Sequence, residues 1–108
     1  MKKFDESYEL LEEMYSDELF PDFLVDKVKY LIEDVIRYLE TGITEEMAIQ
    51  EKFDEMTIAI NDLQEEFDEN DSEIETVARD SIGETVRYIL EWFGIEMDVE
   101  DAIRERDW

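Results

Sequence analysis

The chain contains no cysteine and no histidine. Without cysteine there is no disulfide, no thiolate nucleophile and no cysteine-ligated metal. Without histidine the usual serine and cysteine catalytic triads lack their base, and the Glu-x-x-His motifs of dinuclear carboxylate sites in helical bundles cannot be formed. Zinc and copper sites are disfavoured for the same reason. We therefore predict no catalytic residues, no cofactor and no metal, and we expect that the protein is not an enzyme.

Glycine and proline are also scarce, with three glycines and one proline among 108 residues. This composition suits long helices and differs from that of a loop-rich β fold. The glycines are isolated, so a glycine-rich phosphate-binding loop is absent from the sequence. No apolar run is long enough to span a membrane, and the opening MKKFDESYEL lacks the apolar segment of a secretory signal. We expect one cytoplasmic domain over residues 1–108 that does not bind membranes.

Basic residues are few: 10 stand against 34 acidic ones, which gives a net charge of −24. Such a charge repels nucleic-acid phosphates and anionic membrane surfaces, because neither can release counterions onto a negative protein. We therefore expect no direct nucleic-acid binding. The same charge attracts basic proteins and divalent cations, and the simplest alternative is that it only keeps the protein soluble.

The apolar residues repeat with helical spacing along three long segments. The central segment, Phe20–Glu40, carries the widest apolar face and is expected to be the organising helix of the fold. The stripes of the three segments are Leu24, Val28, Leu31, Val35 and Leu39; Ile49, Phe53, Met56, Ile60, Leu63 and Phe67; and Ile74, Ala78, Ile82, Thr85 and Ile89. The seven-residue repeat of the second stripe is typical of packing inside a bundle, and a dimer seam is the alternative. We predict an all-α, compact antiparallel bundle of four to five helices, as a monomer or homodimer.

Local signals place the ends of the helices. The apolar spacing predicts a first short amphipathic helix over residues 4–15. Gly42 and Gly94 are suited to end two of the long helices in the left-handed conformation. Later helices are expected to begin at capping residues, namely Thr44, the Ser72–Glu75 capping box and Asp98, the last helix running to about Glu105.

Two carboxylate patterns partly match known metal-binding motifs. Asp68, Asn70 and Ser72 match the first positions of an EF-hand loop, but Glu73 stands where glycine is needed. Helical nucleotide pyrophosphohydrolases, which are similarly small and acidic, combine Glu-Glu-x-x-Glu on one helix with Glu-x-x-Asp on a later one. Residues 65–69 match the first half, and the second half does not occur after them. A magnesium-dependent hydrolase of this type is therefore an alternative hypothesis for the function.

The favoured hypothesis is a non-catalytic module that binds a basic protein. A more specific form of this hypothesis is an inhibitor or immunity-type protein that acts against a basic partner such as a nuclease. A nucleic-acid mimic is a further alternative. Among the aromatic residues, Tyr88 and Trp92 are predicted to lie at the boundary of the core, with the ring buried and the polar atom in water. Trp108 is predicted to cover the end of the bundle as a plug. The expected contact is the acidic stretch after Asn61 together with two tyrosines off the central stripe. The candidate partner-binding residues are Glu65, Glu66, Asp68, Glu69, Asp71, Tyr30 and Tyr38.

Three segments carry a family resemblance: FPDFLVDK over residues 20–27, the run from Leu63 to Ile82, and the ending Arg106-Asp107-Trp108. In these the chain resembles a family of small acidic bacterial proteins of about this length that is classified as a domain of unknown function. The resemblance covers nearly the whole chain. It implies a bacterial, cytosolic, compact single domain without an assigned activity, and it carries over no catalytic or binding residue.

Overall fold

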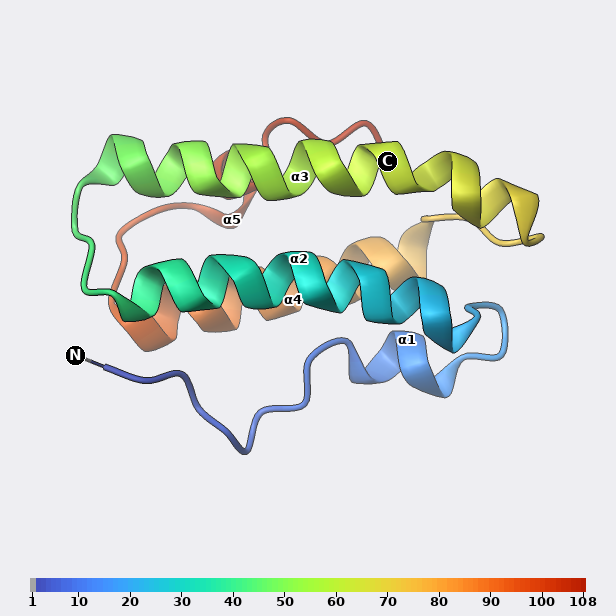
Figure 1. The fold of residues 1–108 in the computed structure, drawn as a ribbon, viewed down its shortest axis with the longest axis horizontal. Coiled ribbons are helices and arrows are strands. Elements are labelled where there is room, and N and C mark those ends of the chain that lie inside the picture. Colours follow the sequence, from blue (N-terminus) through green and yellow to red (C-terminus); the bar gives the residue numbers. More distant parts are fainter. Residues whose placement is uncertain (1) are drawn as a thin grey trace.

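The computed structural model describes residues 2–108, and in them the chain forms five α-helices and no strand. The helices are α1 (Glu12–Ser16), α2 (Asp22–Glu40), α3 (Glu46–Glu69), α4 (Thr76–Phe93) and α5 (Val99–Ala102). The three long helices alternate in direction, and the two short ones lie against them (Figure 1). α3 packs along α2, while α4 contacts both α1 and α5. The predicted all-α antiparallel bundle is confirmed.

The apolar stripes of the long helices meet in one core. Phe53 and Phe67 of α3 are completely buried, as are Ile32 of α2 and Ile82 of α4. Each such side chain contributes about 1.5–3 kcal/mol when it leaves water. The seven-residue repeat of α3 faces this shared core, as packing inside a bundle predicts.

The predicted helix over residues 4–15 is wrong. Leu11 adopts a left-handed backbone conformation with φ of 58°, so only Glu12–Ser16 is helical. The residues before it form an irregular arm that runs alongside the bundle (Figure 1). A helix here would have been short, and it would have placed like charges such as Asp5 and Glu9 four residues apart. Packing of the arm's aromatic rings on α4 outweighs that weak helical preference.

Two predicted capping residues are also wrong. α3 begins at Glu46, and Thr44 lies outside it. α4 begins at Thr76, beyond the proposed capping box of Ser72 and Glu75. The backbone N–H of Ser72 instead donates to the Phe67 carbonyl at 2.9 Å and closes the end of α3. The loop between α3 and α4 is thus fixed by the helix before it.

Three other boundaries are as predicted. Gly42 follows α2 with φ of 89°, and Gly94 caps α4 with φ of 67°, a region that favours glycine. The Asp98 side chain accepts a hydrogen bond from the Glu100 N–H at 3.0 Å and so caps α5. That helix ends at Ala102, earlier than expected, and the residues after it turn back along α3 (Figure 1).

Candidate functional site

An apolar groove of about 410 Å³ runs between α2 and α3. Four residues line it from α2 and two from α3: Asp26, Lys27, Tyr30 and Leu31, and Ala59 and Leu63. The two helices lie side by side along their length (Figure 1), so positions that face outward at the seam between them come together in space. Its accessible lining is almost wholly apolar, which is uncommon on a surface with so many charges.

Large apolar side chains are exposed beside this groove. Tyr30 is 62% exposed and Phe23 48%. Phe23 lies seven residues before Tyr30, and so on the same face of α2. The carboxylates of Asp26 and Glu66 stand at or near the groove. We call this surface, formed by Phe23, Tyr30, Leu31 and Leu63, the α2–α3 patch.

The two tyrosines predicted as contacts differ in environment. Tyr30 belongs to the α2–α3 patch, with the Arg37 guanidinium 5.7 Å from its ring centre. Tyr38 is half-buried, and Lys52 of α3 lies over its ring at 5.5 Å. Lys52 also bonds to Asp34 at 2.7 Å, so Tyr38 is covered by an ion pair that joins α2 to α3. Of the two, only Tyr30 presents its ring to solvent.

The ion pair of Asp34 and Lys52 shifts the protonation of both groups. Hydrogen bonding from Lys52 holds the pKa of the Asp34 carboxyl below its ordinary value. The same hydrogen bond raises the pKa of the Lys52 ammonium. Both groups are therefore charged at neutral pH, and they support the seam next to the groove.

The acidic candidates lie at the end of α3 and in the loop after it. Glu65, Asp68, Glu69 and Asp71 are exposed, as expected. Glu66 is half-buried and forms an ion pair with Lys27 of α2, next to the groove. Within residues 2–108, no group of three or more carboxylates converges on a point that could hold a metal ion.

The comparisons with known proteins place the chain in a family. The model of a family of unknown function (DUF5713) matches residues 4–108. The chain belongs to this family. No match was found among curated proteins or among solved structures. Within residues 2–108, none of the helices combines the length and the apolar character that crossing a membrane requires.

Ion pairs form both within α2 and α3 and between these two helices. Arg37 pairs with Asp34 at 3.6 Å and not with Glu33. Among residues 2–108, Lys27 of α2 pairs with Glu66 of α3, and Lys52 of α3 pairs with Asp34 of α2. These cross-helix pairs tie α2 to α3 on the side where the α2–α3 patch lies.

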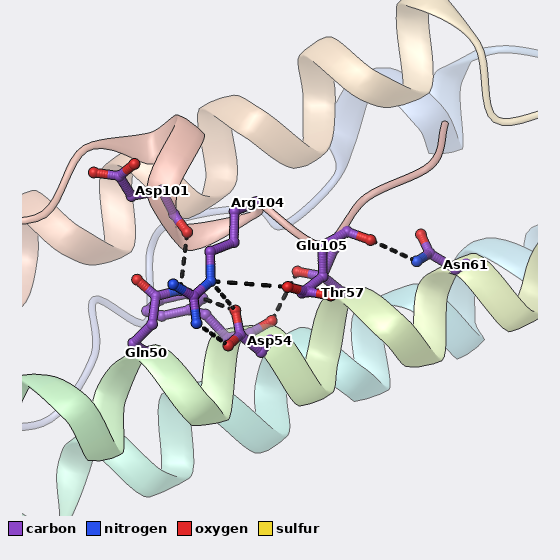
Figure 2. A network of polar contacts seen from close by, with 8 residues as sticks. Gln50, Asp54, Thr57, Asn61, Asp101, Arg104 and Glu105 are labelled. Atoms are coloured by element: carbon purple, nitrogen blue, oxygen red, sulfur yellow. Dashed lines mark hydrogen bonds and ion pairs between the residues drawn. The ribbon is translucent and has the colours of Figure 1, made fainter.

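A polar network that sequence reasoning missed joins α3 to the last residues of the chain (Figure 2). Arg104 donates from Nη2 and Nε to both carboxylate oxygens of Asp54, at 2.7 and 3.1 Å. Gln50 donates to the Asp101 carbonyl at 2.8 Å, and Asn61 donates to the Glu105 carbonyl at 2.8 Å. The signal that identifies it is a polar stripe on α3, at positions 50, 54, 57, 61 and 64, beside the apolar one.

This network holds the chain end in place. Asn61 also accepts from the Asp107 N–H at 3.1 Å, which leads the chain along α3 to Trp108. Trp108 is 9% exposed and belongs to the core, so it covers a side of the bundle and does not plug its end. The carboxylate of Asp54 is saturated by Arg104 and Gln50. These contacts attach the last residues of the chain to α3, and the polar side chains of this network are occupied by them.

The aromatic residues of α4 are covered by the N-terminal arm. Tyr8 stacks on Tyr88 with 4.0 Å between ring centres, and Phe4 meets the edge of Trp92 at 6.1 Å. The Tyr88 hydroxyl donates to the Asp5 carboxylate, which raises the pKa of the Tyr88 phenol. Tyr88 and Trp92 are therefore occupied within the chain, which leaves the α2–α3 patch as the exposed aromatic surface best suited to a partner.

Proposed function

We propose that the protein is a non-catalytic, cytoplasmic binding module that recognises a basic partner protein through the α2–α3 patch. The observation that carries the proposal is an apolar groove, with Tyr30 exposed at its edge, on a chain of net charge −24. Exposed aromatic residues next to an apolar pocket are the usual anchors of protein interfaces. Contiguous apolar surface on a small, highly charged protein marks an interaction site more often than chance exposure.

Charge supplies the other half of the recognition. Exposed carboxylates at positions 65, 68, 69 and 71 lie at the end of α3 and in the loop after it, beyond the groove residue Leu63 along the chain. They would attract a basic protein over long range and raise its association rate, with a strong dependence on ionic strength. The partner that fits both features presents an apolar ridge bordered by lysine or arginine. An inhibitor or immunity-type role against a basic enzyme such as a nuclease is consistent with that chemistry.

The test measures the contribution of the apolar patch, which affects the dissociation rate, separately from that of the carboxylates, which affect the association rate. The protein as bait should capture a basic protein from its source cell at low salt. Tyr30→Ala together with Phe23→Ala should then raise the dissociation rate at least tenfold, because the aromatic anchors are lost while the net charge is unchanged. Neutralising Glu65, Asp68, Glu69 and Asp71 to their amides should instead lower the association rate and flatten its salt dependence. Glu66 is left intact because it pairs with Lys27.

A matched control neutralises four exposed carboxylates elsewhere: Glu6, Glu9, Glu45 and Glu91. The same change in net charge should then leave most of the association rate intact. If both sets slow association equally, net charge alone acts and the α3 end has no special role. If the patch double variant retains full affinity while remaining folded by circular dichroism, the proposed contact surface is wrong.

Nothing in the arrangement of side chains favours the magnesium-dependent hydrolase over this proposal. Glu65, Glu66 and Glu69 lie along one helix, and Glu66 is already paired with Lys27. A nucleic-acid mimic requires carboxylates spaced like phosphates along a groove. The groove here is apolar, so the mimic is not favoured either.

A further inference from the structure

A second groove, of about 480 Å³, lies between α4 and the segment that contains α5 and the chain end. Three of the ten basic residues of the protein line it: Arg79 and Arg87 from α4, and Arg106 from the chain end. This concentration of guanidinium groups on a strongly acidic protein calls for a physical explanation.

Arg79 and Arg87 lie two helical turns apart on the same face of α4. Neither forms an ion pair with any residue in 2–108, although acidic residues outnumber basic ones by more than three to one. Glu75, which lies four residues before Arg79, forms no ion pair with it. Both guanidinium groups are thus free to bind an oxyanion in the bidentate manner that arginine favours.

Gly83 lies midway between these two arginines and also lines the groove. A Cβ atom added there would meet nothing within 4 Å, so close packing does not require glycine at this position. Glycine in the interior of a helix is unfavourable relative to alanine. Its presence leaves open space on the helix surface between the two guanidinium groups, where a ligand can approach the backbone.

Arg106 reaches the groove from the opposite wall. One of its terminal nitrogens donates to Glu100 at 2.9 Å, while its Nε is shielded from solvent and has no acceptor in the described chain. A shielded donor without an acceptor is unfavourable. The half-buried Val99 and the buried Ile103 form the apolar part of the lining beside it.

Carboxylates also line this groove, and they restrict the ligand further. Four carboxylates line it together with the three arginines: Asp80, Glu84 and Glu100, and Asp98, whose side chain caps α5. A bare anion would meet repulsion from them, whereas hydroxyl or amino groups on a ligand would donate hydrogen bonds to them. The preferred ligand therefore combines an oxyanion with hydrogen-bond donors on a compact skeleton.

We propose that the groove between α4 and α5 binds a small organic oxyanion that also carries hydroxyl or amino groups. The oxyanion lies over Gly83 between Arg79 and Arg87, and the donor groups face Asp80, Glu84 and Glu100. A phosphate ester and a hydroxy-carboxylate share this chemistry, and the experiment distinguishes them. The site uses none of the residues of the α2–α3 patch, so it stands whether or not that patch binds a protein.

The experiment is a titration of the ¹⁵N-labelled full chain followed by NMR, at constant ionic strength maintained with sodium chloride. The probes are phosphoserine, L-malate and inorganic phosphate. Phosphoserine or malate should shift the Gly83 amide and the arginine Nε–H signals saturably, and whichever binds more tightly identifies the source of the oxyanion. Inorganic phosphate should bind at least tenfold more weakly, because it offers the carboxylates no amino or alcohol group.

The test variants are Arg79→Gln and Arg87→Gln, each of which should weaken binding about tenfold. The matched control is Arg37→Gln, an exposed arginine on α2 outside the groove, which should leave binding unchanged. Because Arg79 and Arg87 have no ion pairs in the described chain, their loss should not unfold the protein, and circular dichroism checks this. Failure of both organic probes to shift these signals saturably, or equal weakening by all three variants, overturns the proposal.

Discussion

Trp108 offers the most direct test of how the chain end is held. The indole is 9% exposed and belongs to the core, yet its Nε1–H has no hydrogen-bond partner in the described chain. Burying the ring is favourable, whereas burying an unsatisfied donor costs about 1–3 kcal/mol. These two contributions have opposite signs, and two substitutions separate them.

Trp108→Ala removes both the ring and the unsatisfied donor. A buried Trp→Ala change ordinarily costs about 3–5 kcal/mol, and losing the donor returns part of that, so we expect a net loss of about 2–3 kcal/mol. Trp108→Phe keeps most of the ring and removes the donor. The smaller ring costs about 1 kcal/mol, and removing the donor offsets it, so stability should be unchanged or slightly raised.

Trp92 is the matched control, because its Nε1–H donates to the Lys3 carbonyl at 2.8 Å. Trp92→Phe should therefore lose about 1 kcal/mol more than Trp108→Phe does. Urea unfolding followed by circular dichroism at 222 nm measures all three variants without relying on tryptophan fluorescence. If Trp108→Ala loses less than about 1 kcal/mol, the chain end is not packed as described. If the two phenylalanine variants are equally destabilised, the reasoning about the unsatisfied donor is wrong.

Three further predictions concern charge, backbone and pH. Sodium chloride should raise the melting temperature, because it screens repulsion among 34 acidic residues; magnesium chloride at equal ionic strength should raise it no further, and a larger magnesium effect would indicate a carboxylate metal site. Gly83→Ala should stabilise the fold by about 0.5–1 kcal/mol in urea unfolding, since its Cβ meets no neighbour, and it should weaken phosphoserine binding. Burial and the hydrogen bond to Asp26 raise the Tyr15 pKa above its ordinary value, so the folded chain keeps a proton that the unfolded chain loses, and stability should fall as pH rises above about 10. Tyr15→Phe should flatten that decline, and an unchanged slope would contradict the assignment.

The long helices were predictable because their signal is local and repeated. Four to six apolar residues at helical spacing identify each of them, and most of these residues are buried. The helix ends at Gly42 and Gly94 were equally predictable, because few residues other than glycine favour the left-handed conformation at a helix end. Capping by Thr44 and by Ser72 failed because a side-chain cap contributes about 1 kcal/mol, which tertiary packing readily outweighs.

The two ends of the chain could not be predicted from local patterns, because distant contacts hold them. Phe4 and Tyr8 pack on Tyr88 and Trp92, more than seventy positions away. Asn61 holds a chain end that lies 44 residues later. The same distinction applies to the candidate sites. The exposure of Tyr30 could be predicted because Tyr30 lies off the central apolar stripe. The apolar groove beside it exists only because α2 and α3 are packed together.

The use of the few basic residues links the fold to both proposed sites. Lys27, Lys52 and Arg104 each pair with a carboxylate on another element of the fold. The ten basic residues offset only part of the 34 acidic ones, so the surface keeps a net negative field that favours a basic partner. Arg79 and Arg87, like Lys29, form no ion pair within residues 2–108. Arginines that hold nothing together, placed on either side of a helical glycine in a groove, are better explained by a ligand than by the fold.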